Sequence, residues 1–251
     1  MDSYTEKNRT YLLATHRALN LTLPRFLKLK TFFEHDWEAV FKSGIKDLQQ
    51  ADLDGRGIEK FLTSREKIHP TQEMEKLQQC RATVLVYGQK NYPEPLKNIA
   101  QPPVVLFLRG TLLPQDFPAI SVVGSRKITS YGKRALEKIV GEIAEAGITI
   151  VSGFAAGTDI LAQKKAVEHH ARTIGVLGNS IDTIYPVANG HFARQIIHDQ
   201  QGALLSEYFP GTETRPENFP VRNRIVTGLA RATIVIEAAQ KSGSLISATL
   251  A

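Results

Sequence analysis

The chain has 251 residues, of which 42% are hydrophobic and 22% charged, and its formal net charge is +6. This composition excludes an intrinsically disordered protein, and the length is enough for one large domain or two small ones. The single cysteine, Cys80, excludes an intramolecular disulfide and a cysteine-based zinc site. No apolar stretch is long enough for a signal peptide or a membrane span, so we expect a cytoplasmic protein.

Residues 1–78 have the pattern of a small all-helical domain. Apolar positions recur every three or four residues, as at Leu12, His16 and Leu19, which is the spacing of amphipathic helices. The predicted helices cover 9–20, 23–35, 36–44, 45–52 and 57–68. His69-Pro70 predicts the joint to the next part, because the residue before a proline disfavours the helical conformation.

From about residue 82 the pattern changes to strands that alternate with helices. The predicted strands cover 83–88, 104–110, 119–124, 148–153, 173–178, 203–207 and 233–238, and the predicted helices cover 130–147, 158–170, 190–200 and 220–230. Runs such as ISVVG and TIVIE are mostly apolar without a period-two alternation, as expected for strands covered on both faces. This alternation predicts an α/β fold with a Rossmann-like, doubly wound, mostly parallel sheet at 79–251.

Four loops that follow predicted strands are rich in glycine and serine. They are 122–132 (VVGSRKITSYG), 150–159 (IVSGFAAGTD), 176–186 (VLGNSIDTIYP) and 237–245 (EAAQKSGSL). Ligands of parallel sheets bind at this carboxyl edge, where glycine lets the backbone approach a phosphate, although such turns also use glycine for geometry alone. Neither G-x-G-x-x-G nor a Walker loop is present, which excludes the usual dinucleotide and P-loop sites.

Positive charge is concentrated in the same part of the chain. Residues 1–80 hold 13 Lys and Arg against 12 Asp and Glu, whereas 81–251 hold 18 against 13. Arg126 lies in the loop after a predicted strand, and Arg222 and Arg224 lie at a helix start, where cations oppose the helix dipole. A bound anion would remove that cost, and a guanidinium holds phosphates with paired hydrogen bonds. The pattern favours a phosphate-containing ligand over a merely solvated helix start.

Six motifs of the second part resemble the signature series of the DNA-processing protein A family (DprA, also called Smf). They are VGSRKITSYG, SGFAAGTD, LGNSIDTIYP, LLSEYFPG, FPVRNRIVTGLA and SGSLISATLA, in the family's order. The helical part fits the family's SAM-like domain more loosely. The resemblance implies a protein without a cofactor or catalytic activity that binds and protects single-stranded DNA. It also implies a homodimer that helps to load the RecA recombinase in natural transformation.

The resemblance also implies the DNA-binding residues. Those that match the family's motifs are Gly124, Ser125, Arg126, Lys127, Ser152, Gly153, Phe154, Arg222, Asn223, Arg224, Ser242, Gly243 and Ser244. After Tyr185-Pro186 the family often has a cation and in some members a base-stacking aromatic residue, and here His191 and Phe192 occupy that helix start. His191 is charged only at mildly acidic pH or beside phosphate. Phe192 either stacks on a base or packs in the core.

The chain departs from the family's pattern at several positions. Ala156, Thr158 and Gln163 differ from the usual residues, and Asn179-Ser180 stands where a glycine pair is common. Such changes would weaken a single phosphate contact without removing the groove. Because one or two more strands and often a winged-helix-like domain are expected, we interpret the chain as C-terminally truncated, which would affect dimerisation and contact with RecA.

A possible second DNA contact lies in the helical part. Residues 53–61 (LDGRGIEKF) are similar to a helix-hairpin-helix, whose turn offers backbone N–H groups to a phosphate. Arg56 replaces the apolar residue usual between the glycines, and a simple helix–helix turn is the alternative. We expect Arg56 to matter less for DNA binding than Arg126.

Two other functions stay open. One is a Rossmann-type, phosphoribohydrolase-like nucleotide hydrolase, whose carboxylates would be Asp159, Glu207 and Glu237, although its P-G-G-x-G-T-x-x-E motif is missing. The other is a protein-interaction module, although no motif in the sequence supports it.

His169-His170 ends an amphipathic helix. We interpret this pair as a partner of the helix dipole rather than as a metal site, so no metal is expected.

Overall fold

The computed structural model describes residues 4–239, 243, 247 and 249. Its internal contacts divide the chain into two compact units, of which the first comprises 1–92 with 101–105 and the second 93–100 with 106–251. The domain boundary expected near residue 78 stays a prediction, and each unit is described by itself.

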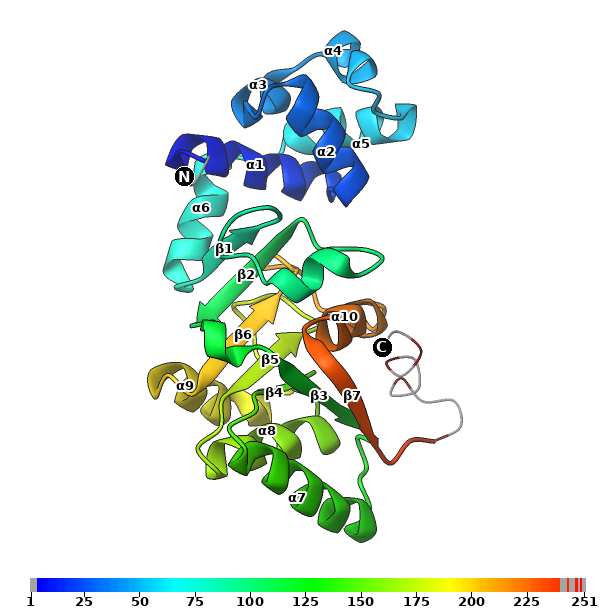
Figure 1. The fold of residues 1–251 in the computed structure, drawn as a ribbon. Helices are drawn as coiled ribbons and strands as arrows, with labels where there is room; N and C mark the ends of the chain where they lie inside the picture. Colours follow the sequence, from blue (N-terminus) through cyan, green and yellow to red (C-terminus); the bar gives the residue numbers. More distant parts are fainter. Residues whose placement is uncertain (1–3, 240–242, 244–246, 248, 250–251) are drawn as a thin grey trace. The chain divides into compact units, whose positions relative to one another are not determined.

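The first unit is built mainly from helices (Figure 1). Their bounds are α1 Glu6–Leu19, α2 Leu23–Phe32, α3 Trp37–Lys42, α4 Ile45–Gln50, α5 Gly55–Arg65 and α6 Pro70–Gln79, followed by the short strand β1 Thr83–Val86. α1 packs against α3, α5 and α6. Leu12 and Leu13 of α1 are fully buried, and the rings of Phe26 and Trp37 stack with centroids 5.3 Å apart. The helical character predicted for the N-terminal region is confirmed.

Helix α6 is the one element of this unit that the sequence analysis missed. Pro70 lies in its first turn, where a missing N–H costs nothing, so the proline starts a helix rather than only ending the previous one. Glu73 and Leu77 are its only buried residues. Two inward positions do not produce the apolar repeat by which helices are recognised in a sequence.

The second unit contains a twisted sheet whose strands follow the order β2-β6-β5-β4-β3-β7. Their bounds are β2 Val105–Gly110, β3 Ala119–Gly124, β4 Ile150–Ser152, β5 Thr173–Leu177, β6 Gly202–Ser206 and β7 Ala230–Ile236. β2 runs antiparallel to β6, and all the other neighbouring pairs are parallel. The predicted α/β, mostly parallel Rossmann-like sheet is confirmed.

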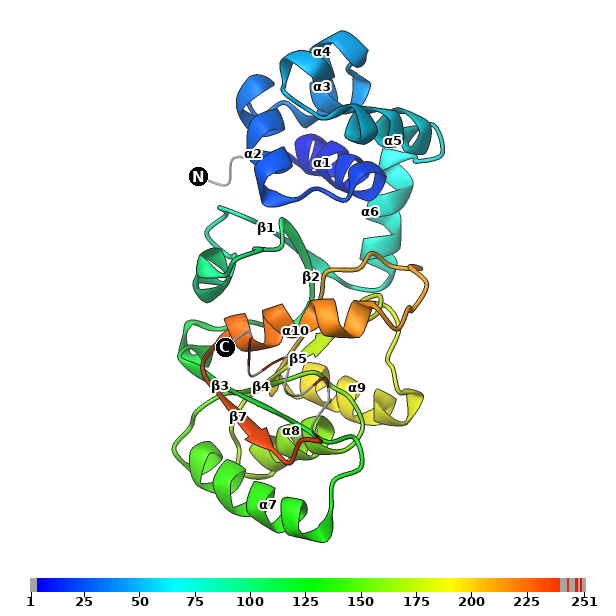
Figure 2. The ribbon, with the colours of Figure 1, turned by 90° about the vertical axis from the view of Figure 1, so that its right-hand side faces the viewer.

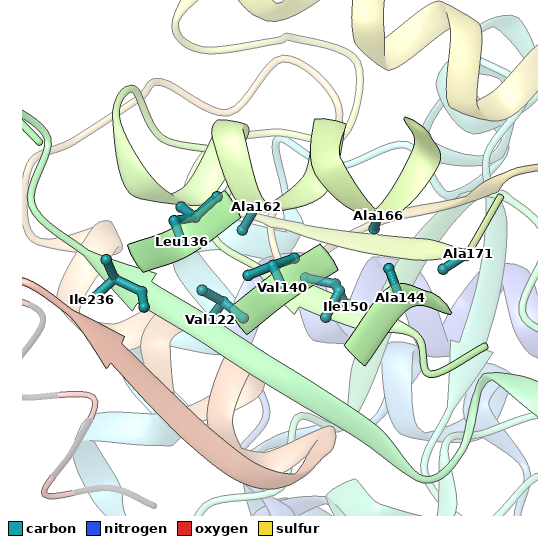
Figure 3. Packing of buried hydrophobic residues seen from close by; sticks show 9 residues of the cluster. All are labelled: Val122, Leu136, Val140, Ala144, Ile150, Ala162, Ala166, Ala171 and Ile236. Carbon is teal, nitrogen blue, oxygen red and sulfur yellow. The ribbon is translucent and has the colours of Figure 1, made fainter. Parts of the chain in front are cut away.

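Helices cover both faces of this sheet. Their bounds are α7 Ser130–Glu145, α8 Thr158–Glu168, α9 Gly190–His198 and α10 Asn218–Gly228, with short 3-10 turns at Glu94–Asn98, Pro114–Asp116 and Val187–Asn189. α7, α8 and α9 follow one face, and α10 lies on the other (Figure 2). Apolar residues of β3, β4, α7 and α8, among them Val122, Val140 and Ile150, form a buried cluster between sheet and helices (Figure 3). This cluster fixes the strand ends from which the loops of the site emerge.

Candidate functional site

A cleft of about 350 Å³ opens at the carboxyl edge of the parallel strands. We call it the edge cleft, and its described lining residues are Val123, Gly124, Ser125, Arg126, Ala155, Asp159, Pro216, Phe219, Pro220, Arg222, Asn223, Ala239, Gly243 and Ser247. It therefore brings together the loop after β3, the start of α8 and the first turns of α10. These segments are far apart in the sequence, as expected for a site at the edge of a doubly wound sheet.

Arg126 is the exposed cation of the edge cleft. Its guanidinium carbon lies 5.8 Å from the centre of the Phe219 ring, close enough for a cation–π contact. The loop beneath it is held by Ser125, whose backbone N–H donates to the Glu237 carbonyl at 2.9 Å and whose carbonyl accepts from Thr158 N at 3.1 Å. Lys127, also exposed, follows in the same loop. The loop thus presents two positive charges from a fixed backbone.

Arg222 is the buried cation of the edge cleft, since only 4% of its surface is exposed. One terminal nitrogen donates to the Val176 carbonyl, while Nε is buried without a hydrogen-bond partner in the described structure. Burial lowers the pKa of Arg222 to about 10, with Asp159 acting in the opposite direction and Arg126 adding to the lowering. An incompletely paired guanidinium in a cleft is a ready partner for an anion.

Asp159, in the first turn of α8, is the acidic counterpart of Arg222. Burial raises its pKa, and this is opposed by the Arg222 charge and by hydrogen bonds from the backbone N–H groups of Ala155 and Gly153. An added Cβ on Gly153 would lie 2.5 Å from Asp159 Oδ2 and 2.6 Å from Arg222 Nη2. Gly153 therefore makes room for these two side chains, which is the geometric role of glycine left open by the sequence.

The serine and aromatic residue beside Gly153 lie in the interior. Ser152 is fully buried and its hydroxyl donates to the Val122 carbonyl at 2.5 Å. Phe154 is also fully buried, and its ring stacks on Phe192 with centroids 5.9 Å apart. Phe192 is 6% exposed, so the geometry favours its packing role over base stacking, and His191 is exposed on α9. None of these four residues lines the edge cleft.

The R-N-R motif divides between two environments. Arg222 and Asn223 line the edge cleft, and Asn223 Nδ2 donates to the Gly243 carbonyl at 3.3 Å. Arg224 instead forms a partly buried ion pair with Glu207, with Nη2 and Oε1 2.6 Å apart. Gly243 lies at the cleft, whereas Ser242 and Ser244 fall outside the described residues.

Glu237 occupies the start of α7. Its carboxylate accepts from Thr129 N at 2.8 Å and from Thr129 Oγ1 at 2.6 Å, and these bonds lower its pKa. A Cβ on Gly132 would lie 2.6 Å from Glu237 Oε2, so this glycine accommodates the glutamate. In dinucleotide-binding Rossmann folds the corresponding helix N-terminus receives the pyrophosphate. Here the chain's own carboxylate fills that place.

An apolar wall of the edge cleft was missed by the sequence analysis. Pro216, Phe219 and Pro220 contribute apolar surface to the cleft, and α10 starts here without a side-chain cap or an acidic residue in its first turn. The F-P step before the arginines was the only available signal. A cleft that combines apolar and cationic surface suits a ligand that combines a flat ring with a phosphate.

Within the described part of the chain, no three His, Cys, Asp or Glu side chains gather in a way that could hold a metal ion. No helix among the described residues has the length and apolarity to cross a membrane.

Comparison with known proteins shows what the chain is similar to. The family model described as DNA recombination-mediator protein A matches residues 83–251. Protein Smf of Synechocystis sp. is 37% identical over 236 residues, which cover 91% of this chain and 57% of that protein. The chain thus spans little more than half the length of this relative.

Two solved structures are similar as well. DNA processing protein A of Streptococcus pneumoniae has a TM-score of 0.80 and 30% identity, covering 96% of this chain and 82% of that one. DNA processing protein A of Helicobacter pylori, whose structure addresses its single-stranded DNA binding mode, has a TM-score of 0.60 and 34% identity. The matched region covers 68% of this chain and 75% of the H. pylori chain.

Proposed function

Because the chain belongs to the DNA recombination-mediator protein A family, whose members are named DprA or Smf, we propose that it binds single-stranded DNA in the edge cleft. The observation that supports this most is the meeting of exposed Arg126 and buried, incompletely paired Arg222 in one cleft with an apolar wall. The structure of the H. pylori relative concerns single-stranded DNA binding, which supports the choice of ligand in this proposal.

The two walls of the edge cleft take different parts of a nucleotide. Arg126 and Lys127 contact backbone phosphates at the mouth, where the strand remains solvated. A base enters against Phe219 and the neighbouring prolines, with Arg222 and Asn223 facing its polar edge or its phosphate. A duplex keeps its bases stacked and paired inside the helix, so it cannot fill the cleft in this way.

Membership of the family supports a proposal for the wider role as well. We propose that the protein protects incoming single strands and helps to load the RecA recombinase in natural transformation, as a homodimer in the cytoplasm. The buried cleft arginine and the exposed loop cations supply only the DNA-binding part of this role.

We propose binding rather than catalysis as the function of the site. The alternative, a phosphoribohydrolase-like enzyme, needs carboxylates that are free to act on a nucleotide. Glu237 accepts two hydrogen bonds at the start of α7, Glu207 pairs with Arg224, and Asp159 is buried beside Arg222. Each of the three acids therefore has a structural role that supports the binding function.

The test is fluorescence anisotropy with a labelled oligonucleotide, single-stranded or duplex, over a series of salt concentrations. We expect micromolar or tighter binding of the single strand, weaker binding of the duplex, and a steep loss of affinity with salt through counterion release. Arg126→Ala should weaken single-strand binding at least about tenfold, the loss expected for a charged contact of roughly 1.4 kcal/mol or more.

Arg231→Ala is the matched control, because Arg231 is an exposed arginine of the same unit at the opposite, amino end of β7. Equal losses in the two variants would contradict a specific role of the edge cleft. Release of ribose phosphate or base from nucleotides is measured in parallel. A wild-type protein that hydrolyses nucleotides and binds no DNA would favour the hydrolase alternative over DNA binding.

A further inference from the structure

Two exposed tyrosines stand out in the second unit, and one of them continues the edge cleft. Tyr185 is 51% exposed and its ring centre lies 5.8 Å from that of Phe219, whereas Tyr131, 74% exposed, has no such described ring contact. Phe219 also lies 5.8 Å from the Arg126 guanidinium. Arg126, Phe219 and Tyr185 thus form a connected row that leads from the cleft to its rim.

The position of Phe219 within this row is fixed by the backbone after β5. A Cβ on Gly178 would lie 2.6 Å from Phe219 Cδ1, so the ring packs directly on that glycine. Phe219 is half-buried while Tyr185 leaves about half of its surface in water. We call these two rings the aromatic shelf, of which Phe219 is the anchored part and Tyr185 the accessible part.

Both aromatic residues that the sequence placed at the DNA are buried, because Phe154 and Phe192 stack on each other. A strand leaving the cleft at Arg126 would next meet the aromatic shelf. A tyrosine ring has an apolar face that stacks on any base and a rigid side chain that loses little entropy on binding.

We propose that Tyr185 stacks on an unpaired base of the bound strand, next to the nucleotide held in the edge cleft. This inference rests on the proposed function and extends it: the ligand is recognised by its exposed bases as well as by its phosphates. It makes binding tolerant of sequence but dependent on the presence of bases.

The experiment measures the affinity of the wild type and of each variant for two ligands. One is a labelled oligothymidylate, and the other is a labelled abasic oligonucleotide of equal length and charge. In Tyr185→Leu we expect affinity for oligothymidylate to fall about tenfold, within the range for loss of one base–aromatic stack, with affinity for the abasic strand unchanged. Tyr185→Phe, which keeps the ring, should bind as the wild type does. Tyr131→Leu is the control for loss of an exposed tyrosine and should leave both affinities unchanged.

A measurement on the unmodified sequence makes the test independent of any folding defect in Tyr185→Leu. An oligonucleotide containing iodouracil should photo-cross-link to Tyr185 in the wild-type protein, as mapped by peptide mass spectrometry. Cross-links at Tyr131 or elsewhere, with none at Tyr185, would overturn the proposal.

The remaining outcomes separate the inference from the proposed function. If Arg126→Ala loses single-strand binding and Tyr185→Leu does not, the inference fails and the proposed function stands. If neither variant changes binding, both fail. Equal losses of Tyr185→Leu on the oligothymidylate and the abasic strand would mean that Tyr185 acts only by supporting Phe219, which also contradicts base stacking.

Discussion

Gly153 shows how a single residue prepares the site without touching a ligand. Its missing side chain leaves the space in which Arg222 and Asp159 face each other in the interior. A methyl group there would lie within 2.6 Å of Arg222 Nη2 and 2.5 Å of Asp159 Oδ2. Both side chains are buried and Arg222 is tied to the Val176 carbonyl, so neither moves aside freely. The position of the buried guanidinium therefore depends on this glycine.

We expect Gly153→Ala to lower the free energy of unfolding by about 1–3 kcal/mol, the usual cost of overpacking, and to weaken single-strand binding because Arg222 is displaced. Thermal unfolding and anisotropy measure the two effects. Gly190→Ala is the matched control: the nearest atom to its new Cβ would be Arg194 Nη1 at 3.6 Å, and its φ of −62° suits alanine. A Gly153→Ala protein as stable and as tightly binding as the wild type would contradict this account.

At the residue scale, sequence rules located some side chains and not others. Arg126 was expected at the carboxyl edge of the sheet because it lies in the loop after a strand, and it lines the edge cleft. Arg224 was assigned to the same site by its motif, yet it pairs with Glu207, 17 residues earlier. No spacing rule relates a residue after β6 to one on α10, so only the tertiary structure reveals this pair.

At the scale of elements, three helix starts that could receive a phosphate already hold carboxylates of the chain. Asp54 accepts from Gly57 N at the start of α5, Glu237 from Thr129 N before α7, and Asp159 lies in the first turn of α8. Helix N-termini attract anions through their free N–H groups and dipole, and an internal carboxylate satisfies both. Glycine-rich turns alone therefore overstate the number of phosphate sites.

Helix α1 contains a buried histidine that makes the stability of the first unit depend on pH. His16 is 3% exposed, and its Nδ1 accepts from Leu21 N at 3.1 Å, which requires the neutral ring. Burial lowers the pKa of His16 to about 4 from 6.5. Below pH 6.5 the unfolded chain binds a proton that the folded chain does not take up until about pH 4.

The stability contributed by neutral His16 is therefore complete above pH 6.5 and is lost as the pH falls towards 4, by up to about 3 kcal/mol. Trp37, the only tryptophan, is buried in this unit, so its fluorescence in urea titrations reports the loss. His16→Gln should be less stable at neutral pH and lack most of this pH dependence. A wild-type urea midpoint that stays constant between pH 6.5 and 4 would contradict the assignment.

At the scale of the whole molecule, the spacing of apolar residues decided which helices and strands could be predicted from the sequence. Strands such as β3 are largely buried and appear in the sequence as mostly apolar runs. The sheet, and the alternation of its strands with helices, could therefore be predicted from the sequence. Helix α6 buries only Glu73 and Leu77 and was missed for lack of that period.

The edge cleft was predictable in its cations but not in its shape. Its apolar wall depends on Phe219 packing against Gly178, two residues that no local pattern connects. The interior positions of Phe154 and Phe192 likewise depend on the long-range stacking of the two rings and on Lys164 of α8 lying over Phe192, not on their own sequence context. Residue type led to the prediction of a cationic edge, whereas long-range packing decided which residues line the edge cleft.

The most direct test of the central claim is hydrogen–deuterium exchange of the wild-type protein with and without single-stranded oligothymidylate. We expect slower exchange at 124–129 and 216–223, the loop after β3 and the first turns of α10, and no change at 54–57, where Asp54 caps α5. Protection confined to the first unit, or absent from both predicted segments at saturating DNA, would contradict the assignment of the edge cleft as the DNA-binding site.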